Sequence, residues 1–75
     1  MSMKKELAKE IRIMEEEIKE LEIKRIRSMS AIIESIISKT EIGADEARFF
    51  RTYSAEIEVK REKLNILRRE YRTKV

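Results

Sequence analysis

The sequence predicts an all-α fold, in which the 75 residues form a single domain built as an antiparallel helical hairpin. Apolar residues recur every three or four positions over two long segments, as they do on one face of a helix. Proline is absent and Gly43 is the only glycine, so the pattern has one clear break. Folding the chain about this break brings apolar residues opposite apolar residues at nearly every level, and this agreement supports the hairpin.

The first helix is predicted over about residues 3–39. Its apolar line begins with steps of four and three, as in a coiled-coil heptad: Leu7, Ile11, Met14, Ile18 and Leu21. Arg25 takes the next heptad position, so we expect the line to drift around the helix to Ile26, Met29, Ile33, Ile36 and Ile37. A neighbouring line of small residues is expected to face solvent: Ser28, Ala31, Ser35 and Ser38.

A turn is predicted over about residues 40–45 and a second helix over about 46–73. Gly43 suits the left-handed position that follows a helix C-terminus, and Asp45 suits the N-cap of the next helix. The second helix carries large apolar residues seven positions apart, at Phe50, Ile57, Leu64 and Tyr71.

Folding about Gly43 sets an expected register between the two helices. It pairs Met14 with Tyr71, and Ile18 with Leu67. Farther along, Met29 is expected to meet Ile57. The first ten residues are then expected to extend beyond the second helix.

The charges of the two helices are expected to pair within the chain. Residues 60–74 hold seven basic and two acidic residues, a net charge of +5, while residues 10–22 hold six acidic and two basic residues, a net charge of −4. The hairpin brings these segments together. The alternative is that basic residues grip the phosphates of a nucleic acid. The candidates for such contacts are Lys4, Lys5, Lys9, Lys24, Arg27, Arg69 and Arg72.

The half of the hairpin near the turn has more large apolar residues than two helices can cover. Soluble monomers rarely leave such a patch exposed, so we expect it to form an oligomer or partner interface. Homodimerisation into an antiparallel four-helix bundle is the leading expectation, and docking of another protein is the alternative. The predicted interface residues are Ile32, Ile33, Ile36, Ile37, Ile42, Phe49, Phe50 and Tyr53.

The composition argues against catalysis and against bound cofactors. Without cysteine or histidine, the chain has no disulfide, thiolate or imidazole chemistry. It has no glycine-rich phosphate loop, and no apolar run approaches the ~20 residues of a membrane span. We therefore expect no enzyme activity, no cofactor, no metal and no membrane partner. Charged residues make up 44% of the chain and Asn65 is the only amide residue, a composition typical of thermophile proteins.

In its length, two-helix plan and acidic turn at Ala44-Asp45-Glu46-Ala47, the chain resembles Rop-type dimeric hairpins. It is similarly reminiscent of small helical-hairpin proteins of archaeal spindle-shaped viruses. This resemblance implies a four-helix bundle that serves as an adaptor or RNA-binding factor, and it carries over no functional residue. The expected function is a non-enzymatic adaptor or assembly protein in the cytoplasm of a thermophilic archaeon, or of the host if the protein is viral. The alternative is a small nucleic-acid-binding regulator.

Overall fold

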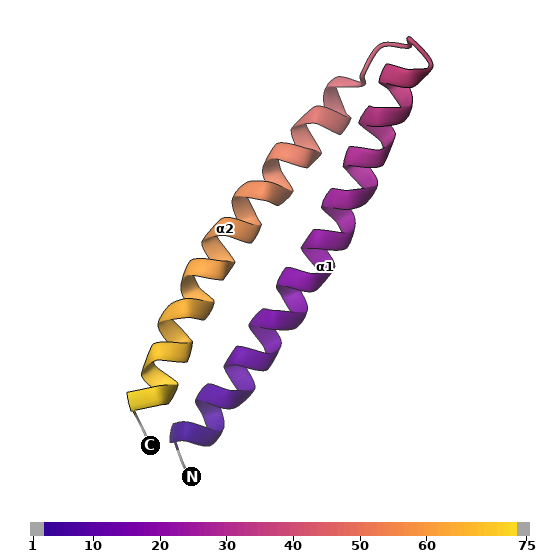
Figure 1. Cartoon of the computed structure of the whole chain (residues 1–75). Helices are drawn as coiled ribbons and strands as arrows, with labels where there is room; N and C mark the ends of the chain where they lie inside the picture. The colour runs from indigo at the N-terminus through magenta and orange to yellow at the C-terminus, as the bar shows by residue number, and fades with distance from the viewer. Residues whose placement is uncertain (1–2, 74–75) are drawn as a thin grey trace.

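The computed structural model describes residues 3–73, which form two α-helices, α1 (Met3–Ile37) and α2 (Ala44–Thr73). The helices run antiparallel and side by side, so the start of α1 and the end of α2 lie at one end of the molecule and the connection lies at the other (Figure 1). The molecule is a rod with extents of 56 × 15 × 14 Å. The predicted all-α hairpin is confirmed.

The connection between the helices is a Schellman turn that uses lysine where glycine was expected. Lys39 has a φ of 57° and is the residue in the left-handed region. Its N–H donates to the carbonyl of Ile36 (3.2 Å), and the Thr40 N–H donates to the carbonyl of Ser35 (2.9 Å). These two bonds are the pair that defines the motif. Because α1 ends at Ile37, before the predicted position 39, the left-handed position falls on Lys39.

Gly43 instead begins α2. Its φ is not positive, and its carbonyl accepts from the Ala47 N–H (3.3 Å), as the residue before a helix does. Asp45 lies inside the first turn of α2 and pairs with Arg48 at 2.8 Å. The expectations of a left-handed Gly43 and of Asp45 as the N-cap were therefore wrong, because α2 starts at Ala44 rather than near residue 46.

The seam between the helices keeps a strict heptad spacing along the whole of α1. After Leu21 it continues through Arg25, Ser28, Ile32 and Ser35, all of which are buried or half-buried. The expected drift of the seam was wrong, since Ile26, Met29, Ile33, Ile36 and Ile37 are all exposed. The expectation for the small residues was wrong for Ser28 and Ser35, which lie in the seam, and Ser28 is only 7% exposed. It was also wrong for Ala31, which is half-buried beside the seam.

The physical reason lies in α2. Its large residues Phe50, Ile57, Leu64 and Tyr71 return to the same line every seven positions, so the helix packed against them must keep that period as well. Small side chains such as those of Ser28 and Ser35 leave room for them. The centre of the core combines both helices, with Ile57 fully buried. Its members are Ile18, Leu21, Ile57 and Leu64, with Ile11, Met14 and Tyr53 packed against them.

The register also differs from the expected one. Lys4 lies 5.0 Å from the centre of the Tyr71 ring, and Leu7 is buried. Met29, expected to meet the buried Ile57, is 39% exposed. α2 thus reaches about one helical turn, roughly 5 Å, farther toward the start of α1 than expected, and the first residues of α1 are covered. The error came from centring the fold on Gly43, whereas the connection spans residues 38–43.

The register can be tested at the start of α1. Replacing Leu7 with alanine should lower the free energy of unfolding by about 2 kcal/mol, because it removes a buried side chain. Met3→Ala, at an exposed position on the same helix, is the control and should change it by less than about 0.5 kcal/mol. Chemical denaturation followed by circular dichroism measures both. Equal, small effects would mean that the first turns of α1 are not packed.

The connection gives a second test. Lys39→Gly should stabilise the hairpin by about 0.5–1 kcal/mol, because it relieves a left-handed backbone that costs a side-chain-bearing residue about 1–2 kcal/mol. Gly43→Ala should be close to neutral, since its added Cβ would meet only Glu46 Cγ at 3.6 Å. Thermal and denaturant unfolding give the two values. A destabilising Gly43→Ala together with a Lys39→Gly that does not stabilise would mean that Gly43, and not Lys39, is the left-handed residue.

Candidate interaction surface

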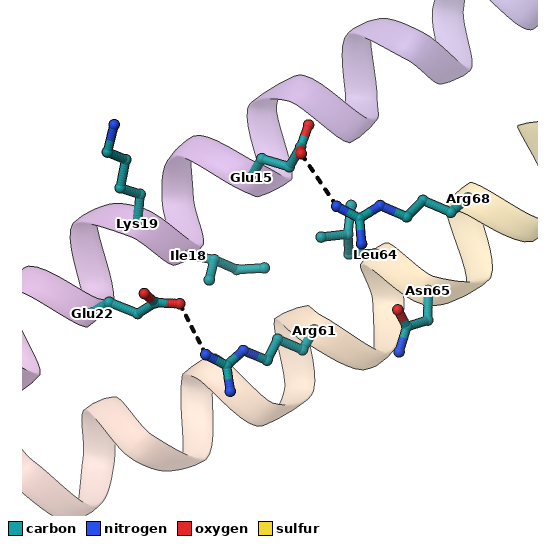
Figure 2. Close-up of a pocket in the computed structure, with 8 residues that line it drawn as sticks. All are labelled: Glu15, Ile18, Lys19, Glu22, Arg61, Leu64, Asn65 and Arg68. Carbon is teal, nitrogen blue, oxygen red and sulfur yellow. Dashed lines mark hydrogen bonds and ion pairs between the residues drawn. The ribbon is translucent and has the colours of Figure 1, made fainter.

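One flank of the hairpin carries two ion pairs that bridge the helices. Arg68 donates to Glu15 at 3.2 Å and Arg61 donates to Glu22 at 2.9 Å (Figure 2). Between the two pairs lies an open groove of about 390 Å³ with Ile18 and Leu64 among its lining residues. We call this side, defined by Glu15, Glu22, Arg61 and Arg68, the arginine flank.

The groove is poorly suited to chemistry on a small molecule. Both of its guanidinium groups already have a carboxylate partner, and all four charged side chains are about 40–50% exposed. Lys19 and Asn65 border it, and Figure 2 shows Lys19 pointing away from the two ion pairs. Exposed pairs of this kind contribute only ~0–1 kcal/mol each and are screened by salt. The arrangement therefore serves the alignment of the helices better than ligand binding.

Among residues 3–73, the other flank has one cross-helix ion pair. Lys60 donates to Glu17 at 2.6 Å, and Glu20, Lys24 and Glu56 border the same shallow hollow. Together with the two pairs of the arginine flank, this bond confirms that the basic part of α2 pairs with the acidic part of α1.

The arginine flank changes character toward the connection. A step of seven residues makes two turns and returns to the same side of a supercoiled helix. From Glu15 and Glu22 such steps lead to Met29 and Ile36, and from Lys19 they lead to Ile26 and Ile33. These four side chains are between 39% and 61% exposed. We call this set, Ile26, Met29, Ile33 and Ile36, the apolar patch.

On α2, the same flank carries small residues beside the apolar patch. Steps of seven back from Arg61 lead to Ser54 and then to Ala47, both of which are half-buried. The arginine flank thus has a charged, grooved half near the chain ends and an apolar half near the connection. In the apolar half, α1 carries large side chains on this flank, whereas α2 carries the small side chains of Ala47 and Ser54.

The residues predicted to form an interface do not all share this surface. Ile33 and Ile36 belong to the apolar patch, whereas Ile32, Phe50 and Tyr53 are half-buried along the seam between the helices. Ile37, Ile42 and Phe49 are exposed outside the patch. The Phe49 ring stacks on Tyr53 with centroids 6.2 Å apart, and the Arg48 guanidinium lies 5.9 Å from its centre.

Sequence reasoning placed all four members of the apolar patch on the drifting seam, and it missed two of them, Ile26 and Met29, as interface residues. The signal that could have placed them was the heptad itself. Continued without a break past Leu21, it runs through Arg25 and Ser28 and leaves both residues outside the seam.

The basic residues considered for nucleic-acid contacts are spread over several faces. Lys4 lies over Tyr71, and Lys5 borders the hollow beside this ring. Lys24 lies among acidic residues on the flank of Lys60. The remaining candidates are exposed on the outer sides of the two helices: Lys9, Arg27, Arg69 and Arg72.

Within residues 3–73, no group of three or more acidic side chains is arranged to hold a metal ion. Over the same residues, neither helix contains a stretch long and apolar enough to cross a membrane.

Comparison with known proteins found no match: no family model, no curated protein and no solved structure resembles the chain significantly. None of these comparisons shows the resemblance to Rop-type hairpins.

Reversing the charges of the arginine flank tests its role in aligning the helices. The double variant Glu15→Arg, Glu22→Arg should lower the free energy of unfolding by about 0.5–2 kcal/mol, because each new arginine faces another arginine. Adding Arg61→Glu and Arg68→Glu should restore most of the loss. The matched control adds Arg69→Glu and Arg72→Glu instead and should not restore it. Recovery in the control would show that only net charge matters.

Proposed function

We propose that this protein is a non-enzymatic adaptor or assembly factor that acts through helix–helix contacts, and that its first partner is a second copy of itself. The apolar patch forms the contact, and two hairpins make a four-helix bundle. The main support for this proposal is the apolar patch itself. It is a line of large, exposed apolar side chains on α1, and the seam of α1 that packs against α2 does not include them.

The width of the apolar face supports a bundle. A pair of helices needs only a narrow seam on each, two positions in seven. A helix inside a bundle needs a third apolar position beside the seam. Near the connection, α1 has this wider face, because Met29 and Ile36 adjoin the seam residues Ser28, Ile32 and Ser35. In the half near the chain ends, the same flank positions hold Glu15 and Glu22.

The energy involved is large for so small a protein. Full burial of a large apolar side chain is worth about 1.5–3 kcal/mol, and the patch residues are roughly half exposed. Covering the eight side chains of two patches would therefore give about 6–12 kcal/mol before the costs of association. A small domain has a total stability of only about 5–15 kcal/mol, so pairing would change its stability substantially.

Catalysis is not part of the proposal, since the charged groups of the groove are exposed and paired with one another. The adaptor role rests on the surfaces that a bundle would leave outside, including Phe49, Ile37 and Ile42. The composition supports a cytoplasmic setting in a thermophilic organism or its virus.

The patch can be tested by placing a charge in it. Ile33→Glu should convert the dimer to a monomer, because the carboxylate would be buried in an apolar contact. Val59→Glu is the matched control, since Val59 is similarly exposed, at 56% against 47%, but lies on α2 outside the patch. It should leave the dimer intact. Light scattering coupled to gel filtration, over a dilution series, measures the molecular mass, and the wild type should also melt at higher temperature when more concentrated.

A wild-type monomer at every concentration would refute the proposal, and so would dissociation by Val59→Glu alone. Salt-dependent binding of the folded protein to duplex DNA or RNA, abolished by Lys5→Gln, Arg69→Gln and Arg72→Gln, would favour the nucleic-acid-binding alternative instead.

A further inference from the structure

We infer that two copies pair along their arginine flanks with both connections at the same end, related by a twofold axis parallel to the rod. This inference rests on the proposed dimer and adds the orientation of its subunits. It follows from the way in which charge and apolar surface are distributed along one flank.

A twofold axis parallel to the rod leaves the position of each residue along the rod unchanged, so every level of one hairpin lies beside the same level of the other. α1 of one copy then faces α2 of its partner. At the charged end, Glu15 faces Arg68 of the second copy, and Glu22 faces Arg61. Each of these four charges thus meets an opposite charge at its own level, which offsets the water lost from both groups. Flanking charges of opposite sign are the usual determinant of partner orientation in helical assemblies.

The same axis brings the apolar halves together near the connection. The two patches meet across the axis, where Met29 and Ile36 of each copy point toward the centre. Ala47 and Ser54 are small and let the neighbouring helix approach closely. Large side chains therefore meet small ones, and none of the four charged residues that define the arginine flank lies against the patch.

The opposite full-length arrangement, with connections at opposite ends, lacks this match. Its axis crosses the rod, so the apolar half of each copy covers the charged half of the other. With the axis at the midpoint of α1, Ile26 of each copy would lie at the level of Glu15 of the other, and the Glu22 residues of the two copies would approach each other. Charges placed against apolar side chains lose water without gaining a partner, so this arrangement is disfavoured.

An end-overlapped dimer, in which only the two patches touch, is disfavoured by size. A full flank of the rod measures about 56 × 15 Å. This is roughly 800 Å² per partner, the area typical of a stable protein interface. The apolar half alone offers about half of it, in the range of weak or transient contacts.

The charge-reversed variant provides the decisive experiment. Glu15→Arg, Glu22→Arg, Arg61→Glu and Arg68→Glu together keep every pair within one hairpin, so the variant should fold and dimerise with itself. Mixed with the wild type, it would place glutamate opposite glutamate and arginine opposite arginine. We expect fewer mixed dimers than the statistical proportion, by at least threefold, in native mass spectrometry with one partner isotopically labelled. A statistical mixture would overturn the inference while leaving the dimer in place.

Spin labels give an independent measurement, because the chain has no cysteine and each introduced one is unique. Separate Thr73→Cys and Glu41→Cys variants mark the two ends of the rod. In the inferred dimer, both label pairs should lie about 20–30 Å apart, two to three interhelical spacings. Opposite connections would put both near the rod length of 56 Å, and an end-overlapped dimer would put the Thr73 labels farther apart still. Either pattern would refute the orientation alone, whereas a monomeric mass would refute the proposed function as well.

Discussion

The structure depends on one constraint: two helices of 35 and 30 residues remain in contact from end to end. A straight α-helix drifts ~20° per heptad away from a repeat of seven, which would carry its seam roughly 100° around the helix over five heptads. Contact over this length therefore requires both helices to keep the heptad spacing. α2 keeps it with Phe50, Ile57, Leu64 and Tyr71, and α1 must follow even where its own residues on that line are Arg25 and serines.

That constraint also creates the interaction surface. Because the seam of α1 takes the small residues near the connection, its large residues there are left on the flank. The same heptad positions carry the glutamates of the cross-helix ion pairs in the other half of the helix. One side of the rod is thus divided into a charged half and an apolar half without any change in the backbone. The proposed pairing and its orientation both come from this division.

Much of the fold could be predicted from the sequence, because helical periodicity and a single glycine are strong local signals. The pairing of Lys60, Arg61 and Arg68 with acidic residues of α1 was predicted correctly from charge alone. The register could not be predicted, because it depends on the residue at which α1 ends. The sequence favours Gly43 for the left-handed position after the helix, and nothing in it indicates that Lys39 adopts this conformation instead.

The candidate surface was predicted only in part, for a related reason. Hydrophobicity favours Ile26 and Met29 over Arg25 and Ser28 as seam residues when α1 is considered by itself. The choice is reversed by the spacing and size of the residues on α2, which act across the hairpin and not along the local sequence. Local patterns therefore identify the helices, whereas the sides they bury are decided by the partner helix.

The uneven seam has a consequence for the order in which the hairpin forms. The fully buried Ile57 and its neighbours Leu21, Ile18 and Leu64 lie toward the middle and the chain ends, far from the connection. The Glu15–Arg68 bond joins residues 53 positions apart. The contacts between residues that are close in the sequence, next to the connection, are thus the weaker ones. If the helices began to pair there, the first contacts would contribute little free energy. The hairpin therefore forms only when segments that are distant in the sequence come into contact, which slows folding. In the folded monomer, the end near the connection is the less tightly packed end and opens most readily.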